Sequence, residues 1–224
     1  MTSPESSTVA GPVERRPRPR IESLADLIFG LSLSIGSIAL LTTSARTPFD
    51  IDSHILAFAF TFLILITAWI IYTTDMSVLP VETRAVTFLN ILLLLLVALV
   101  PYLLNTVEFI DPTISADASF AIRDYSSTLF ALDLSGILLI LAAFSHVISI
   151  EENRLVSPEV VHLFRNGRNR MLVLSVVMAA SIAPVFWQVS IFGVPARIYV
   201  WYLPLISYWV GRAFRPDSRT YKLS

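Results

Sequence analysis

The sequence changes from charged to apolar within a few residues, where Arg20-Ile-Glu-Ser-Leu-Ala-Asp26 leads into Leu27-Ile-Phe-Gly-Leu-Ser-Leu-Ser-Ile-Gly-Ser-Ile-Ala-Leu-Leu41. An aspartate at the centre of a helix in lipid costs about 2.5–3.5 kcal/mol, so Asp26 needs a partner, an aqueous cavity or a function. The run behind it alternates bulky aliphatic residues with Gly and Ser. That pattern is typical of a helix that packs closely against others or lines a pore.

The composition indicates a membrane protein with several spans. The chain has 224 residues, of which 55% are hydrophobic and 15% charged, and its mean hydropathy is +0.71. A soluble domain carries about 25% charged residues. The formal net charge of −1 gives no reason to expect a nucleic-acid partner. The absence of cysteine excludes disulfides and thiolate metal sites. We find no metal-ligand cluster or nucleotide motif, and we expect neither a cofactor nor an enzyme.

Six apolar stretches have the length that a membrane-spanning helix needs, so we expect an all-α, six-span transmembrane bundle. They cover residues 24–43, 54–74, 85–105, 126–150, 171–190 and 197–213. Residues 20–214 would form the membrane domain, residues 1–19 a disordered cytoplasmic tail and residues 215–224 a short cytoplasmic tail. Pro101 predicts a bend or an end near the close of the third span. We see no repeat between the two halves, which counts against an inverted-repeat transporter.

Basic residues gather on one side of this topology. Every Lys and Arg except Arg46, Arg123 and Arg197 falls on the side of the two termini. The positive-inside rule therefore predicts that both termini are cytoplasmic. The opposite loops are acidic, which would either concentrate cations there or simply solvate the loops; their acidic residues are Asp50, Asp52, Glu108, Asp111, Asp117 and Asp124.

Two explanations fit the small residues of the first span. Gly30, Ser34 and Ser37 recur at helical spacing, and Gly30 and Ser34 form a small-xxx-small pair that lets helices approach closely. In the other explanation the serine hydroxyls offer oxygens to a partly dehydrated cation, and aliphatic side chains form a hydrophobic constriction.

Further polar residues lie within the predicted spans. Asn90 is at the same depth as Arg20 and Asp26, so the three side chains are candidates for a hydrogen-bond network between helices. Asp133 and His146 in the fourth span are secondary candidates, because an acid inside a membrane is a functional hypothesis and a histidine titrates near neutral pH.

The order of these features resembles the prokaryotic members of the transmembrane protein 175 potassium channel family. The first span in that family opens with Arg-x-x-x-Phe-Ser-Asp, and this chain has Arg20 and Asp26 with Leu24 and Ala25 between them. The second span carries Ser-Phe and then Trp seven residues after the Phe. The third carries Asn, a leucine-rich run and Pro-Phe. The corresponding residues here are Thr61-Phe62, Trp69, Asn90 and Pro101-Tyr102.

The resemblance implies a homotetramer in a prokaryotic cell membrane, with one central pore lined by the first span of each chain. It implies potassium ions as the permeant partner and Leu31 as the narrowest ring. It further implies Ser34 as a hydroxyl layer that favours potassium, and Ile38 as a continuation of the aliphatic wall. Arg20 and Asp26 would hold the pore helix in place rather than bind ions.

Three functions therefore remain open at the level of sequence. The first is a passive, potassium-preferring cation channel gated by dewetting of a hydrophobic ring. The second is a secondary or proton-coupled transporter that uses Asp133 and His146. The third is a non-conducting membrane scaffold, in which the small-residue stripe packs against its own chain.

Overall fold

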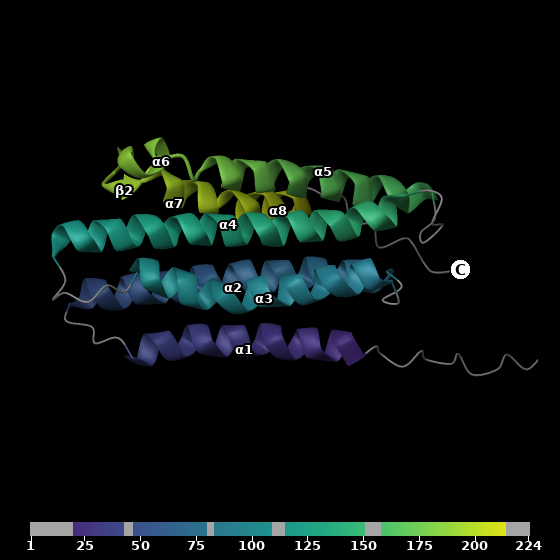
Figure 1. Cartoon of the computed structure of the whole chain (residues 1–224), viewed down its shortest axis with the longest axis horizontal. Coiled ribbons are helices and arrows are strands. Elements are labelled where there is room, and N and C mark those ends of the chain that lie inside the picture. Colours follow the sequence, from purple (N-terminus) through teal and green to yellow (C-terminus); the bar gives the residue numbers. More distant parts are fainter. Residues whose placement is uncertain (1–19, 43–46, 80–82, 109–114, 151–157, 214–224) are drawn as a thin grey trace, which may run out of the picture.

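The computed structural model describes residues 20–42, 47–79, 83–108, 115–150 and 158–213. The two predicted tails, residues 1–19 and 215–224, lie outside these ranges. Five long helices run along a common direction (Figure 1). They are α1 (Arg20–Thr42), α2 (Pro48–Met76), α3 (Arg84–Glu108), α4 (Ala116–Ser149) and α5 (Pro158–Ala180). In Figure 1, α1 forms one outer layer, α2 and α3 the next, and α4 separates them from α5.

Local sequence fixes where two of these helices begin. Thr47 caps α2 with a capping box: its side chain accepts from the backbone N–H of Asp50, and Asp50 accepts from the backbone N–H of Thr47. Pro48 follows at the first helical position, where a missing N–H costs nothing. Ser115 caps α4 by accepting from Ala118 N–H.

Three helices of the described chain are long and apolar enough to cross a membrane: Asp50–Met76, Arg84–Glu108 and Ala116–Ser149. A shorter apolar segment, Ser23–Ile38, lies within α1. The protein is therefore an integral membrane protein, as the composition predicts. The expected bend or end at Pro101 does not terminate α3, which continues to Glu108 with the proline inside it.

The last part of the chain departs from the sequence prediction. α5 begins at Pro158 rather than at residue 171 and ends at Ala180. Four short elements follow: α6 (Val185–Gln188), the antiparallel strands β1 (Ser190–Ile191) and β2 (Val194–Pro195), and α7 (Ala196–Trp201). α8 (Leu203–Ala213) completes the described chain.

The prediction of continuous spans over residues 171–190 and 197–213 is therefore wrong in its bounds. Pro184, Pro195 and Pro204 lie at the breaks, where each removes a backbone donor. The sequence prediction did not include the first half of α5, because Arg165, Arg168 and Arg170 lower the hydropathy of that segment.

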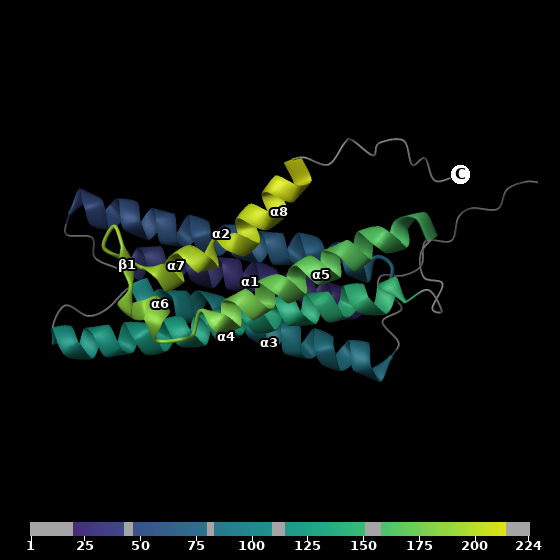
Figure 2. The ribbon, with the colours of Figure 1, turned by 90° about the horizontal axis from the view of Figure 1, so that it is seen from above.

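The core is centred on α4, which packs against α3 on one side and α5 on the other (Figure 2). Phe130, Leu141 and Phe144 of α4 are fully buried. Gly136 brings α4 close to α3, since a Cβ atom at this position would lie 2.9 Å from Leu96 Cδ1. In Figure 2, α8 diverges from α5 toward its C-terminal end.

Candidate functional site

One face of α1 anchors the helix to the bundle. Ala25, Phe29 and Ser32 are buried, and they recur at the spacing of one helical face. Further along the same face, a Cβ atom at Gly36 would lie 3.8 Å from Thr61 Cγ2 of α2. α1 therefore packs on α2 and α3 through small and aromatic residues.

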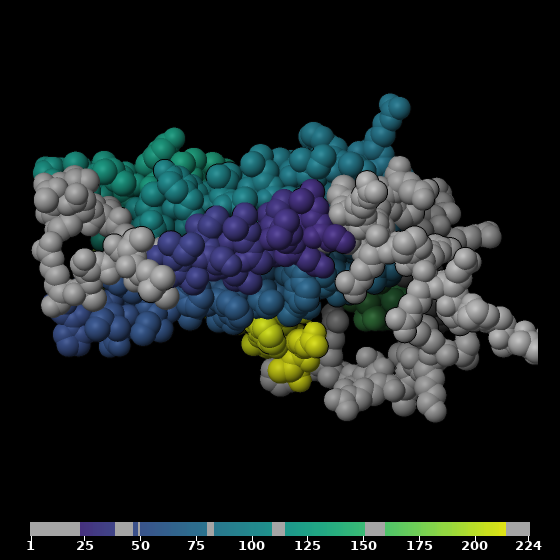
Figure 3. Space-filling view, turned by 90° about the horizontal axis from the view of Figure 1, so that it is seen from below, coloured from purple at the N-terminus to yellow at the C-terminus, as the bar shows by residue number. Residues whose placement is uncertain are grey.

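The opposite face of α1 is uncovered and largely aliphatic. Leu31 is 57% exposed, Ile38 is 53% exposed, and Leu27 and Ser34 are exposed between and beside them. Figure 3 shows α1 lying across the surface of the molecule with α2 and α3 flanking it. The three residues that the sequence suggests for a pore wall thus share one exposed stripe.

The exposed serine of this stripe keeps its oxygen available to a ligand. The Ser34 hydroxyl donates to the carbonyl oxygen of Gly30 at 2.9 Å, and the Ser37 hydroxyl donates to the carbonyl oxygen of Ser34 at 2.7 Å. A hydroxyl that has donated its hydrogen still carries lone pairs, which can accept a hydrogen bond or coordinate a cation. Gly30 has no heavy atom within 4 Å of where its Cβ would be, so another helix could approach it closely.

Asp26 is held by a residue of the neighbouring helix. Trp69 Nε1 of α2 donates to Asp26 Oδ1 at 2.9 Å. A cavity of about 180 Å³ lies beside this bond, between α1 and α2, and Gly30, Leu33 and Leu65 are among its lining residues. The bond supplies Asp26 with the partner that its place at the edge of an apolar run requires.

Of the other two residues in the predicted polar network, the structure describes the side chain of Asn90. Asn90 is fully buried, and neither of its amide atoms has a hydrogen-bond partner among the residues that the structure describes. The side chain of Arg20 lies outside the described residues. The joint network of Arg20, Asp26 and Asn90 therefore stays a prediction, whereas the partner found for Asp26 is Trp69.

Comparison with solved structures gives one match of high probability. It is the crystal structure of a lysosomal potassium-selective channel TMEM175 homolog from Chamaesiphon minutus, with a TM-score of 0.59 and 16% sequence identity. The alignment covers 88% of this chain and 97% of the other. The chain has the fold of that TMEM175 homolog. No protein-family model and no curated protein sequence matches it.

Within this TMEM175-like fold, the two secondary candidates lie far apart. Asp133 is buried in α4, and its carboxylate oxygens find no hydrogen-bond partner in the described part of the chain. His146 is exposed near the end of the same helix, where its Nδ1 lies 3.1 Å from Arg168 Nη1. Thirteen residues of helix separate the two by about 20 Å, so they do not form one site.

A buried arginine joins three parts of the TMEM175-like fold. Arg197 of α7 is only 1% exposed and lies 5.4 Å from the centre of the Trp187 ring. Its Nη1 atom lies 2.9 Å from Asp124 Oδ1 and 2.7 and 2.8 Å from the hydroxyls of Ser127 and Thr128, so its two hydrogens are shared among these acceptors. Nη1 also contacts the carbonyl oxygen of Asp124, and Nε and Nη2 donate to the carbonyl oxygens of Ser181 and Ile182.

This cluster is not evident from the sequence, in which Arg197 and Asp124 read only as charges of the loops. A second buried contact was also missed, in which the Ser145 hydroxyl of α4 donates to Asp75 Oδ2 of α2 at 3.1 Å. The signal for Arg197 was a lone arginine at the start of an apolar stretch, a position that requires an acidic or carbonyl partner.

Proposed function

We propose that the chain is a potassium-preferring cation channel, in which copies of the chain place the exposed face of α1 around a central pore. One observation carries the proposal: an aliphatic stripe of α1 that includes Ser34 faces away from its own bundle, in a chain with the fold of a channel homolog. A single chain does not enclose this stripe. The channel would therefore be a homo-oligomer, and the family resemblance points to a tetramer.

The side chains of the stripe suggest distinct roles. A ring of Leu31 side chains, one from each copy, would form the constriction and close by excluding water. Ser34, one turn further along the helix, would offer hydroxyl oxygens to a potassium ion that has lost part of its hydration shell. Ile38 would extend the aliphatic wall. The Asp26–Trp69 bond would hold the pore helix against α2.

The exposure of Leu31 and Ser34 counts against a scaffold in which this face of α1 packs only within its own chain. A non-conducting scaffold of that kind would bury Leu31 and Ser34 against the other helices, and both are exposed. Leucine next to lipid would also leave Leu31 exposed, so exposure alone does not assign a pore. Flux through the protein decides between the two.

The test is potassium flux into liposomes that contain the purified protein, with no coupling ion and no pH gradient. The wild-type protein should pass potassium, and Leu31→Asn should raise the flux because a polar ring holds water where an aliphatic ring excludes it. Leu139→Asn is the matched control, since Leu139 of α4 is 52% exposed but lies on another helix. Wild-type liposomes without potassium flux, or equal flux from the two variants, would contradict the proposal.

A proton-coupled transporter is the second candidate, and Asp133 is the observation that favours it. A buried carboxyl group without a described partner is a place where a proton can bind during transport. This mechanism predicts saturable uptake driven by a pH gradient and abolished in Asp133→Asn. Uptake that does not respond to the gradient would eliminate it.

We also infer that both termini face the cytoplasm of a prokaryotic cell, from the distribution of basic residues. Because the chain contains no cysteine, single cysteines can report its orientation. Phe192→Cys at the exposed hairpin tip should react with a membrane-impermeant maleimide added to intact cells, and Arg84→Cys should not. The reverse labelling pattern would invert the topology.

A further inference from the structure

A cleft of about 320 Å³ opens between α5 and α8, the two helices that diverge in Figure 2. Residues of α2 and α4 form its floor. They lie near the C-terminal ends of α2 and α4, which are at the same end of the bundle. The lining residues combine an apolar wall with polar and basic groups. They include Asp75, Leu163, Phe164, Gly167, Arg170 and Arg212.

Two arginines give the cleft a basic rim. Arg170 of α5 donates from Nη1 to the carbonyl oxygen of Ser207 at 3.4 Å, and its guanidinium lies 5.8 Å from the centre of the Tyr208 ring. Arg212 of α8 is exposed and donates from Nη1 to the Tyr208 hydroxyl at 3.4 Å. A guanidinium carries five N–H donors in a planar fork, and this long bond engages one donor of Arg212. The rim is therefore suited to an anion with several oxygens.

The one acidic residue among the described lining residues, Asp75, does not neutralise the positive charge of this rim. Asp75 is buried in the floor, and the Ser145 hydroxyl donates to its Oδ2 at 3.1 Å. The exposed charge at the mouth is thus that of Arg212, while Asp75 lies beneath and is held within the bundle.

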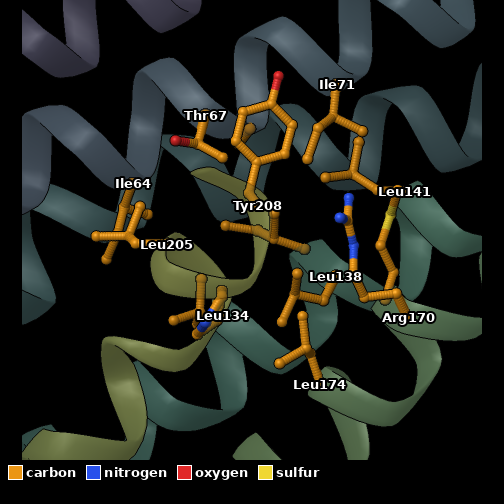
Figure 4. A pocket seen from close by; sticks show the side chains of 14 residues that line it. Ile64, Thr67, Ile71, Leu134, Leu138, Leu141, Arg170, Leu174, Leu205 and Tyr208 are labelled. Atoms are coloured by element: carbon orange, nitrogen blue, oxygen red, sulfur yellow. The ribbon is translucent and has the colours of Figure 1, made fainter. Parts of the chain in front are cut away.

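Below the rim, the walls are apolar and continue into the bundle. A narrow crevice adjoins the cleft and shares Ile71, Arg170, Met171 and Tyr208 with it. Figure 4 shows Arg170 and Tyr208 beside Leu138, Leu174 and the other aliphatic side chains that line this crevice. A ligand that satisfies both parts has an anionic head and a hydrocarbon tail.

We propose that this cleft is a binding site for an anionic phospholipid, with its phosphate at Arg170 and Arg212 and an acyl chain against the apolar wall of α5. The bilayer that surrounds the protein supplies phospholipid at high concentration. Basic pockets between membrane helices attract acidic lipid headgroups. The site lies apart from the exposed face of α1, so it exists whether or not the chain conducts ions. A lipid there bridges α5 and α8 and holds the divergent helix against the bundle.

Native mass spectrometry of the detergent-purified full chain tests the proposal. The probes are phosphatidylglycerol and phosphatidylcholine with the same acyl chains, and inorganic phosphate alone. We expect tighter binding of phosphatidylglycerol than of phosphatidylcholine. Arg212→Gln should weaken the binding of phosphatidylglycerol about fivefold, the factor that corresponds to one basic residue at an anionic lipid surface.

Two further variants separate this cleft from general attraction to lipid. Gly167→Leu should abolish retention of phosphatidylglycerol by filling the cleft, since a Cβ at Gly167 meets only Met171 Cε, at the ordinary distance of 3.9 Å. Arg84→Gln removes the same charge from the exposed start of α3 and should leave binding unchanged.

Several results would overturn the site. Equal affinity for the two lipids would show that the headgroup charge is not recognised. Binding of inorganic phosphate as tight as that of phosphatidylglycerol would indicate a site for soluble anions. An equal loss of affinity for phosphatidylglycerol in Arg84→Gln and Arg212→Gln would show that binding depends on the total surface charge and not on this cleft.

Discussion

Replacement of Arg197 by Gln should destabilise the protein, because Arg197 is a buried charge held by several partners. Arg197 is buried: its Nε and Nη2 donate to the carbonyl oxygens of Ser181 and Ile182, and its Nη1 shares two hydrogens among oxygens of Asp124, Ser127 and Thr128. A glutamine is shorter and reaches only some of these acceptors. Removal of one partner from a buried charged network typically costs about 3–5 kcal/mol, because the remaining groups lose their compensation.

The expected size of the effect can be measured as a melting temperature. For a chain of about 150–250 residues, each kcal/mol shifts the midpoint by about 2–4 °C, so Arg197→Gln should melt about 6–20 °C lower than the wild type. The assay is thermal unfolding in detergent followed by tryptophan fluorescence, to which Trp187 beside the guanidinium contributes. Arg197→Lys keeps the charge but loses the planar guanidinium with its five donors. Its melting temperature should lie between those of the wild type and Arg197→Gln.

Two controls decide whether the network causes the loss. Arg123→Gln removes an exposed arginine of α4, next to Asp124 in the sequence, and should change stability by less than about 0.5 kcal/mol. Asp124→Asn should cost less than Arg197→Gln, because the Asp124 side chain is 42% exposed and water can replace part of its bond. Equal melting temperatures for Arg197→Gln and Arg123→Gln would refute the reasoning.

Three further predictions concern Trp69, Gly136 and Asp133, and the same melting assay tests them. Trp69→Phe removes the bond to Asp26 and should cost about 0.6 kcal/mol, with little further loss when Asp26→Asn is added; fully additive losses would deny the contact. Gly136→Val should cost about 1–3 kcal/mol through its clash with Leu96, and Leu96→Ala should relieve that cost; a Gly136→Val protein as stable as wild type would exclude close packing here. Asp133→Leu should stabilise the fold by about 1–3 kcal/mol, because it removes a buried carboxyl group with no described partner, and a lower melting temperature would reveal a partner.

The existence of the first four helices follows from the sequence because each contains a long apolar run. α2, α3 and α4 each contain more than one turn beyond the predicted apolar stretch, since helices continue past the hydrocarbon into capped, polar ends. Hydropathy identifies only the apolar part. The starts at Thr47 and Ser115 depend on capping side chains that hydropathy does not weigh.

The region after Ala180 was not predictable in the same way. Its apolar residues occur in pieces separated by prolines, so length alone suggested two spans where the structure has α6, a hairpin, α7 and α8. The hairpin turn places Phe192 and Gly193 at positive φ, a conformation that a phenylalanine gives no reason to expect.

Helical periodicity was sufficient to group Leu31, Ser34 and Ile38 on one face, because it depends only on local geometry. The partners of the charged residues depend on tertiary structure instead. Trp69 is 43 residues from Asp26, and Arg197 is 73 residues from Asp124. Spacing along the chain cannot show which distant groups meet, so the sequence grouped Asp26 with Arg20 and Asn90 by depth and counted Arg197 among the charges of the loops.

The most direct test of the proposed channel is the reversal potential across a planar bilayer with potassium on one side and sodium on the other. The wild-type protein should give a potential that favours potassium, and Leu31→Asn should move it toward zero as the constriction widens and hydrates. Leu139→Asn should leave it at the wild-type value. A wild-type bilayer without conductance, or the same potential in Leu31→Asn as in the wild type, would contradict a pore that narrows at α1.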